Sequence, residues 1–300
     1  MPRPRIAFGS WAFAFGPFEA DPWEFDRICR YLADAGYDGV EINGFRPHPH
    51  DEDYATDAAC APLRGLLDEL GLGISAYAPD FRSTPPADVP QADYLRRVAS
   101  TVAFCRRLGI ETLRTDSVSP PGPVEPERFD RLAAAWRAAA DLAGGEGVRL
   151  VWEFEPGFWL NRPSQVIAMI EAVDHPNFSI LFDSSHAYTG AVAGGRQGAD
   201  PELLPGGVSE YAKLLGDHIG HIHLIDSDGS LHDDETSAHL PLGQGKIDFD
   251  ELVDALPDRA WQLPWWTVDF CFCATTEADG RLAVPFVERL LDRRTAEAAS

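Results

Sequence analysis

The sequence has little positive charge. Its 300 residues include 25 lysines and arginines against 48 aspartates and glutamates, which gives a formal net charge of −23. The acidic residues are spread along the chain, so the surface should repel phosphate backbones and gain nothing from counterion release. This argues against nucleic acid as a partner and favours a neutral small molecule.

Cysteine is also scarce, and long hydrophobic runs are missing. Five cysteines in 300 residues are too few for a disulfide framework. We expect Cys29, Cys60 and Cys105 to pack as small core residues, and Cys271 and Cys273 to pack near a site. No apolar stretch is long enough for a signal peptide or a membrane span. We therefore expect a soluble cytoplasmic protein with no membrane partner.

The chain does contain one repeated pattern, namely an amphipathic run, a glycine and a short β-like run. It occurs around Gly36, Gly71, Gly109, Gly147 and Gly216. A glycine that closes a helix supplies the left-handed cap that turns the chain back toward a sheet. The predicted strands cover residues 5–9, 39–42, 73–77, 111–114, 149–153, 178–183, 218–224 and 265–269. The predicted helices cover residues 23–35, 58–70, 94–108, 126–142, 164–173, 209–215, 249–256 and 284–298.

This alternation predicts the α/β fold of a (β/α)8 TIM barrel in which residues 1–300 form a single domain. The loops that follow the strands are long and rich in proline, glycine and histidine, and they should all lie on the catalytic face of the barrel. They cover residues 45–54, 79–90, 188–207 and 227–245.

Four of the apolar strands end on side chains that can bind a metal: Glu153, Asp183, His223 and Asp269. Burying such groups is costly unless they are paired or metal-bound, and the strand ends of a parallel barrel meet at one mouth. We therefore predict one divalent metal ion. Carboxylates with one imidazole suit Mn²⁺ first, with Mg²⁺, Co²⁺ or Zn²⁺ as alternatives.

Residues two apart in a strand share a face, so the side chain of Glu155 should point the same way as Glu153, and that of His221 the same way as His223. Glu155 is then either a base or a group that orients a ligand. His221 either lines the pocket or donates a hydrogen bond behind it.

At these residues the chain resembles the xylose isomerase-like TIM-barrel superfamily of sugar isomerases and epimerases. The matching segments, in order, are Glu-Phe-Glu-Pro-Gly at 153–157, Phe-Asp-Ser-Ser-His at 182–186, His-Ile-His-Leu-Ile-Asp at 221–226 and Leu-Gly-Gln-Gly-Lys-Ile-Asp-Phe at 242–249. The opening segments, 7–11 and 36–42, fit as well. The resemblance covers nearly the whole chain but is weak as a guide to the substrate.

The resemblance implies that the metal is held by Glu153, Asp183, His223 and Asp269, and that His186 contacts the substrate. Position 269 departs from the family, because the eighth strand there normally carries a glutamate, one methylene longer. In the epimerases that glutamate also moves a proton. The change puts a symmetrical two-base epimerisation in doubt, while a ligand role for Asp269 survives more easily than a base role.

The implied chemistry is proton abstraction next to a carbonyl, through an enediolate that the metal stabilises. Glu153 or Glu155 is the predicted base, and His186 would polarise or protonate a substrate oxygen. Further candidates for substrate contact are His221, Lys246, Trp11 and Glu41, although Lys246 could be a solvated lysine and Glu41 part of a structural salt bridge. The predicted apolar walls comprise Trp11, Phe13, Phe15, Phe158 and Trp159. The histidines predicted to lie on the surface are His48, His50, His232 and His239.

Several functions remain open beside a sugar isomerase or epimerase. One is a lyase of the same fold, either the metal subunit of a C-glycoside deglycosidase that acts on 3-oxo-glycosides or an inosose dehydratase-like enzyme; Asp269 favours this class. Another is a non-catalytic barrel that serves as a binding partner. A DNA-repair endonuclease on the same barrel would need a basic groove, which the net charge of −23 argues against. We expect a small-molecule sugar or sugar derivative as ligand and a homo-oligomer, with a second subunit if the protein is a deglycosidase.

Overall fold

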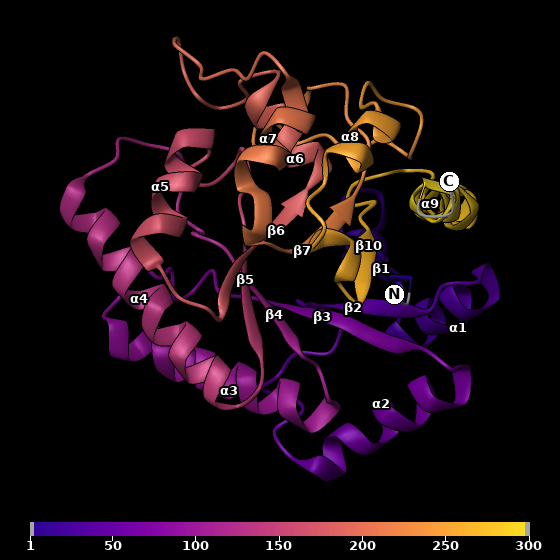
Figure 1. Ribbon diagram of the computed structural model, residues 1–300. Helices are drawn as coiled ribbons and strands as arrows, with labels where there is room; N and C mark the ends of the chain where they lie inside the picture. Colours follow the sequence, from indigo (N-terminus) through magenta and orange to yellow (C-terminus); the bar gives the residue numbers. More distant parts are fainter. Residues whose placement is uncertain (1–2, 298–300) are drawn as a thin grey trace.

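The computed structural model describes residues 3–297, in which eight parallel strands close into one barrel (Figure 1). The strands follow one another around the barrel in the order β1-β10-β7-β6-β5-β4-β3-β2. Their bounds are β1 Arg5–Gly9, β2 Gly39–Gly44, β3 Gly73–Pro79, β4 Thr112–Thr115, β5 Arg149–Glu153, β6 Phe178–Asp183, β7 Ile219–Leu224 and β10 Trp265–Val268. The predicted (β/α)8 barrel is confirmed, while the assignment of all 300 residues to one domain stays a prediction.

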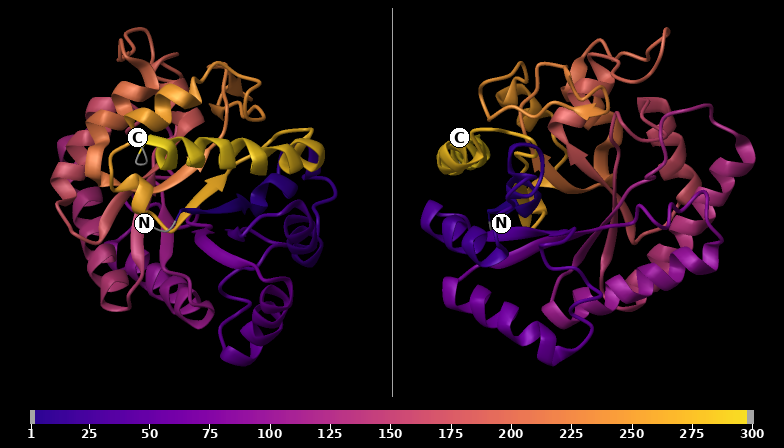
Figure 2. Two further views of the ribbon diagram at one scale, coloured as in Figure 1. Left: turned by 45° about the vertical axis from the view of Figure 1, so that its right-hand side comes forward. Right: turned by 180° about the vertical axis from the view of Figure 1, so that it is seen from behind.

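Helices surround the barrel, and α9 packs against both α1 and α8, which closes the ring (Figure 2). Their bounds are α1 Phe25–Ala35, α2 Asp57–Leu70, α3 Gln91–Leu108, α4 Pro126–Gly145, α5 Pro163–Val173, α7 Gly207–Leu215, α8 Phe249–Ala255 and α9 Thr276–Glu297. The last helix begins earlier than predicted, and residue 298 lies outside the described residues. Within residues 3–297, no helix is both long and apolar enough to cross a bilayer.

The predicted glycine caps are present at the ends of three helices. Gly36, Gly71 and Gly109 follow α1, α2 and α3 with φ angles of 88°, 67° and 70°. Each amide donates hydrogen bonds back into the last turn of its helix, so the chain can reverse toward the next strand. The repeat seen in the sequence therefore encodes the helix-to-strand turns.

An α-helix and a β-hairpin on the catalytic face were not predicted. Helix α6 (Ser184–Ala191) follows β6 directly, and a small antiparallel hairpin of β8 (Leu231–His232) and β9 (Thr236–Ser237) stands in the loop after β7. Helix α6 is buried on nearly every side, so it shows no amphipathic pattern that sequence reasoning could detect. Both elements bring side chains to the barrel mouth.

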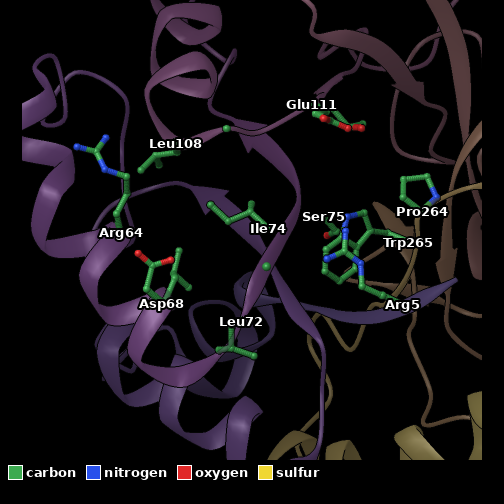
Figure 3. A pocket seen from close by; sticks show the side chains of 14 residues that line it. Arg5, Arg64, Asp68, Leu72, Ile74, Ser75, Leu108, Glu111, Pro264 and Trp265 are labelled. Carbon is green, nitrogen blue, oxygen red and sulfur yellow. The ribbon is translucent and has the colours of Figure 1, made fainter.

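The opposite end of the barrel is closed by Trp265, at the start of β10. A Cβ atom at Gly39 would lie 2.6 Å from its ring, and a Cβ atom at Gly73 would lie 2.7 Å from it. The guanidinium of Arg5 stacks over the same ring, 3.7 Å from its centroid. A cavity of about 340 Å³ lies beside this plug, with Ser75 on its inner wall (Figure 3). This end is the one away from the predicted metal ligands.

Candidate functional site

The four predicted ligands meet at the carboxyl ends of neighbouring strands. Glu153 ends β5, Asp183 ends β6, His223 lies in β7 and Asp269 follows β10, and these strands adjoin one another in the barrel. One ligand atom from each residue lies within 4.8 Å of the others. His223 Nδ1 is 2.9 Å from Glu153 Oε1, 3.5 Å from Asp269 Oδ2 and 3.8 Å from Asp183 Oδ2.

This cluster has the properties of a cation site. Glu153 Oε1, Asp183 Oδ2 and His223 Nδ1 are buried, and none of them has a hydrogen-bond partner within the described part of the chain. Burial raises the pKa of Asp183 to about 7, and the neighbouring carboxylates of Asp269 and Glu153 add to the effect. A divalent cation would satisfy the unpartnered atoms and offset the crowded negative charge, so the residues fit the predicted metal.

Asp269 offers only one oxygen to this cluster. Its Oδ1 accepts hydrogen bonds from Trp11 Nε1 at 2.6 Å and from the Cys271 amide at 2.8 Å. Burial favours the neutral acid, but His239 and His223 outweigh it and hold the pKa of Asp269 well below its usual range. An ionised carboxylate with one oxygen anchored and the other facing the cluster suits a ligand.

The two oxygens of Asp183 also have different partners. Its Oδ1 accepts the backbone amide of His186 at 2.7 Å and so caps the N-terminus of α6, while Oδ2 faces the cluster. The cap explains why a helix starts directly after β6. It also fixes His186 at the mouth of the barrel.

Arg114, in β4, is a site residue that sequence reasoning missed. Its Nη1 lies 2.7 Å from Glu153 Oε2, and its Nη2 lies 3.0 Å from Glu155 Oε1 and 3.5 Å from Asp116 Oδ2. The signal was available, since an arginine inside a predicted buried strand needs a buried acidic partner. Burial opposes ionisation of Glu153, but Arg114 and His223 outweigh it and lower the pKa of Glu153.

A cavity of about 150 Å³ opens next to the cluster, smaller than the pockets that take drug-sized ligands. Five predicted catalytic or substrate-contacting residues line it: Trp11, Glu153, Glu155, His186 and Asp269. The rest of the lining comprises Phe15, Asn43, Phe45, Ala78, Arg114, Thr236, His239, Cys271 and Phe272. The size suits a single small substrate such as one sugar ring.

Glu155 and His186 lie side by side in this cavity. Glu155 Oε2 accepts a hydrogen bond from Thr236 Oγ1 at 3.0 Å and lies 3.9 Å from His186 Nε2. Burial raises the pKa of Glu155 to about 8 and lowers the pKa of His186 to about 3. The ring of His186 is oriented by a contact between Nδ1 and Ser237 Oγ. A neutral imidazole beside a weakly acidic carboxyl group can exchange protons or hydrogen bonds with a substrate.

The prediction that four histidines lie on the surface is wrong for three of them. His48, His50 and His239 are buried, and His232 is half-buried, stacked on Phe272 with ring centroids 4.0 Å apart. His239 reaches the site because Asp226 and Leu240 form a backbone bridge that folds the long loop back over the barrel. Its Nδ1 lies 3.4 Å from Asp269 Oδ1. No local sequence pattern predicts the bridge between Asp226 and Leu240.

The predicted aromatic walls are present only in part. Trp11 and Phe15 line the cavity, together with Phe45 and Phe272, which were not predicted. Phe13 instead packs in the core against Trp23, with ring centroids 4.5 Å apart. Phe158 and Trp159 are not among the lining residues, and Trp159 donates its Nε1 hydrogen to the Pro123 carbonyl.

Three residues predicted to contact substrate lie outside the cavity lining. Glu41 and His221 are buried beneath the cluster, where His221 Nε2 and Glu41 Oε2 are 2.8 Å apart. Lys246 is exposed, and its Nζ donates to the Asp228 carbonyl at 3.0 Å. These positions are the ones that the alternatives describe for His221, a hydrogen-bonding residue behind the pocket, and for Lys246, a solvated lysine, while substrate contact by any of the three stays a prediction. For Glu41, the salt-bridge alternative describes the observed position.

The predicted cysteine environments agree with the structure. Cys29, Cys60 and Cys105 are buried in the core, and Cys271 lines the cavity, with Cys273 buried beside it. Asp226 accepts hydrogen bonds from the amides of Gly243, Gly245 and Ile247, so it organises the loop after β7 and stays out of the cavity.

Comparisons with known proteins agree with this architecture. The fructoselysine 3-epimerase of Escherichia coli O157:H7 is 24% identical over 251 residues, which are 79% of this chain and 82% of that protein. The inosose dehydratase of Geobacillus thermodenitrificans (strain NG80-2) is 22% identical over 290 residues, 90% of this chain and 88% of that protein. The structure of an L-ribulose 3-epimerase superposes with a TM-score of 0.71 at 22% identity, over 99% of this chain and 98% of that one. The family model described as xylose isomerase-like TIM barrel matches residues 29–271, more than half of the chain, so the protein belongs to that family.

Proposed function

We propose that the protein is a divalent-metal-dependent sugar isomerase or epimerase that removes a proton next to a carbonyl. Its family and the names of its relatives make it an enzyme of the sugar isomerase, epimerase or lyase type. The observation that carries the proposal is the cluster of unpartnered buried ligand atoms directly beside a cavity lined by Glu155 and His186. Mn²⁺ is the proposed metal, and the homo-oligomer and the cytoplasmic location stay predictions.

In this proposal, different residues hold the metal and transfer the proton. A divalent cation held by Glu153, Asp183, His223 and Asp269 would polarise the substrate oxygens and stabilise developing negative charge. Glu155 is the proposed base, because burial raises its pKa to about 8, which makes it a stronger base than an ordinary carboxylate, whereas the pKa of Glu153 is lowered.

His186 completes the proposed arrangement. Its Nδ1 is held by Ser237, so Nε2 is free to exchange a hydrogen bond with a substrate oxygen. Arg114 pairs with the carboxylates of both Glu153 and Glu155 and offsets part of their negative charge. Trp11 covers one side of the cavity while it anchors Asp269.

The test is turnover in heavy water with ketohexoses, inososes and 3-oxo-glycosides. The carbon that loses its proton should take up deuterium; if the proton is shielded and returned, a substrate deuterated there should react several-fold more slowly. Glu155→Gln should reduce turnover by roughly 10²- to 10⁴-fold while it keeps the metal. Glu127→Gln, at an exposed position of α4, is the matched control. A substrate that is converted with neither isotope effect would exclude the mechanism.

Elimination is the second candidate, and the geometry of Asp269 favours it. Epimerisation by two carboxylate bases needs a free carboxylate on each side of the substrate, but Asp269 Oδ1 is held by two donors and Oδ2 faces the ligand cluster. An elimination needs only one base and one group that protonates the leaving oxygen. An inosose dehydratase-like enzyme or a 3-oxo-glycoside lyase, the latter with a second subunit, would fit. Mass spectrometry separates the two outcomes, since isomerisation conserves the substrate mass and elimination does not.

A further inference from the structure

Glu41 is a fully buried carboxylate of the barrel interior. It lies in β2, has no exposed surface and sits below the cavity. Its Oε2 is 2.8 Å from His221 Nε2, 2.9 Å from Thr267 Oγ1 and 3.3 Å from Ser75 Oγ. Its Oε1 is 3.1 Å from His223 Nε2. Each oxygen is therefore fixed by partners from other strands, and the carboxylate cannot turn without leaving donors unpaired.

His223 is the contact that connects Glu41 to the proposed metal. The imidazole is fully buried, with Nε2 on Glu41 and Nδ1 among the oxygens of Glu153, Asp183 and Asp269. A histidine binds a metal through a nitrogen that carries no proton, so the remaining proton must sit on the other nitrogen. Glu41 is an acceptor placed to receive that proton on Nε2.

We propose that Glu41 is a positioning residue, which accepts the Nε2 hydrogen of His223 and thereby aims the Nδ1 lone pair at the metal. The proposal rests on the proposed metal site. A carboxylate in this position fixes both the tautomer and the ring orientation of the ligand and increases its basicity. Glu41 thus acts through His223 and does not touch substrate.

Ser75, a buried neighbour of Glu41, provides a matched control. Ser75 touches Glu41 Oε2 at the longest of the four distances and also lines the cavity at the Trp265 end of the barrel (Figure 3). Thr267 and His221 still hold the same oxygen when the Ser75 hydroxyl is absent. Ser75→Ala therefore changes a buried neighbour of Glu41 but leaves the contact between Glu41 and His223 in place.

The experiment is a calorimetric titration of the chelator-treated full chain with Mn²⁺. Glu41→Ala should weaken Mn²⁺ binding by about 10- to 100-fold, the usual cost of losing the acceptor behind a histidine ligand. The affinity of Ser75→Ala for Mn²⁺ should stay within about twofold of that of the parent, because the long contact between Ser75 and Glu41 contributes little. Circular dichroism checks that each variant is folded.

A second variant covers the case in which Glu41→Ala does not fold. Glu41→Gln keeps the volume but loses the charge and can accept from only one of the two histidines, so it should still weaken binding several-fold. The ¹⁵N spectrum of the Zn²⁺-loaded parent should place the remaining proton of His223 on Nε2. Binding within twofold of the parent by either folded variant, or a proton on Nδ1, would overturn the proposal. A parent that binds no Mn²⁺ would overturn the proposed metal site, and this proposal with it.

Discussion

At the scale of single residues, Asp269 stands where the sequence resemblance leads us to expect a glutamate. Its carboxylate is anchored by Trp11 and by the Cys271 amide, and only Oδ2 points toward the other ligands. A shorter side chain held in this way can serve as a metal ligand, but it cannot swing toward a substrate carbon. We therefore expect the residue to influence which reaction the proposed site performs.

We predict that Asp269→Asn, which keeps the shape but loses the charge, weakens Mn²⁺ binding at least tenfold, as measured by calorimetry. Asp269→Glu should keep the metal and the fold but alter the reaction product, since its longer arm can supply a second base. Asp116→Asn is the control, because this carboxylate pairs with Arg114 outside the ligand cluster. An Asp269→Asn variant as active as the parent would leave neither a ligand role nor a base role tenable.

We predict that His48 makes the stability of the protein depend on pH. Burial lowers the pKa of His48 to about 4 from an ordinary value of 6.5, and the ring contacts the Trp23 carbonyl and Asn43. Between pH 6.5 and 4 the unfolded chain binds a proton at His48 that the folded chain does not. The free energy of unfolding should therefore fall as the pH decreases through this window, by up to about 3 kcal/mol.

The test is urea unfolding of the chelator-treated protein between pH 7 and pH 4.5. His48→Gln can form similar hydrogen bonds but does not titrate. Its free energy of unfolding should therefore change less steeply with pH, by a slope that corresponds to about one proton fewer bound on unfolding. His218→Gln, on the surface, should keep the slope of the parent. Equal slopes for the parent and His48→Gln would show that His48 does not cause the effect.

At the scale of elements, the sequence predicted the strands and most helices because their signals are local. Glycine caps, apolar strand cores and terminal carboxylates can be read within a few residues, and they placed Glu153, Asp183, His223 and Asp269 at one mouth. Helix α6 and the β8–β9 hairpin were missed, since a helix buried on nearly all sides has no stripe and two-residue strands have no period. His239 was misplaced for a related reason: its burial depends on the bridge between Asp226 and Leu240, a contact set by tertiary structure.

The barrel strands also contain a steric requirement that can be tested. A Cβ atom at Gly39 would lie 2.6 Å from the Trp265 ring and 2.7 Å from the Gly73 carbonyl oxygen, and the backbone atom cannot move aside cheaply. Gly39→Ala should destabilise the fold by about 2–3 kcal/mol. Gly65→Ala, in exposed α2 with no atom within 4 Å, should instead stabilise it by about 0.5–1 kcal/mol. Thermal unfolding measures both, and a neutral Gly39→Ala would show that the Trp265 ring and the Gly73 carbonyl can both shift.

At the scale of the whole molecule, the two ends of the barrel have opposite characters. The amino end of β10 carries the Trp265 plug and the stacked Arg5. The carboxyl end gathers Glu153, Asp183 and Asp269 around His223, in a chain whose net charge is already −23. The Trp265 end is stabilised by packing. The carboxyl end contains buried negative charge that Arg114 offsets only in part.

The barrel should therefore be measurably more stable with its metal than without it. A ligand that binds only the folded state adds about 2.7 kcal/mol when its concentration is a hundred times its Kd, which corresponds to a rise of several degrees in Tm for a chain of this size. We expect Mn²⁺ to produce such a rise in chelator-treated protein, followed by scanning calorimetry. Because an acidic surface also attracts cations without a specific site, the decisive comparison is Asp183→Asn. This variant can still accept the His186 amide and cap α6, but it loses the charge at the cluster, so Mn²⁺ should no longer raise its Tm. An equal rise in the parent and in Asp183→Asn would mean that the ion stabilises the surface and not the carboxyl end of the barrel.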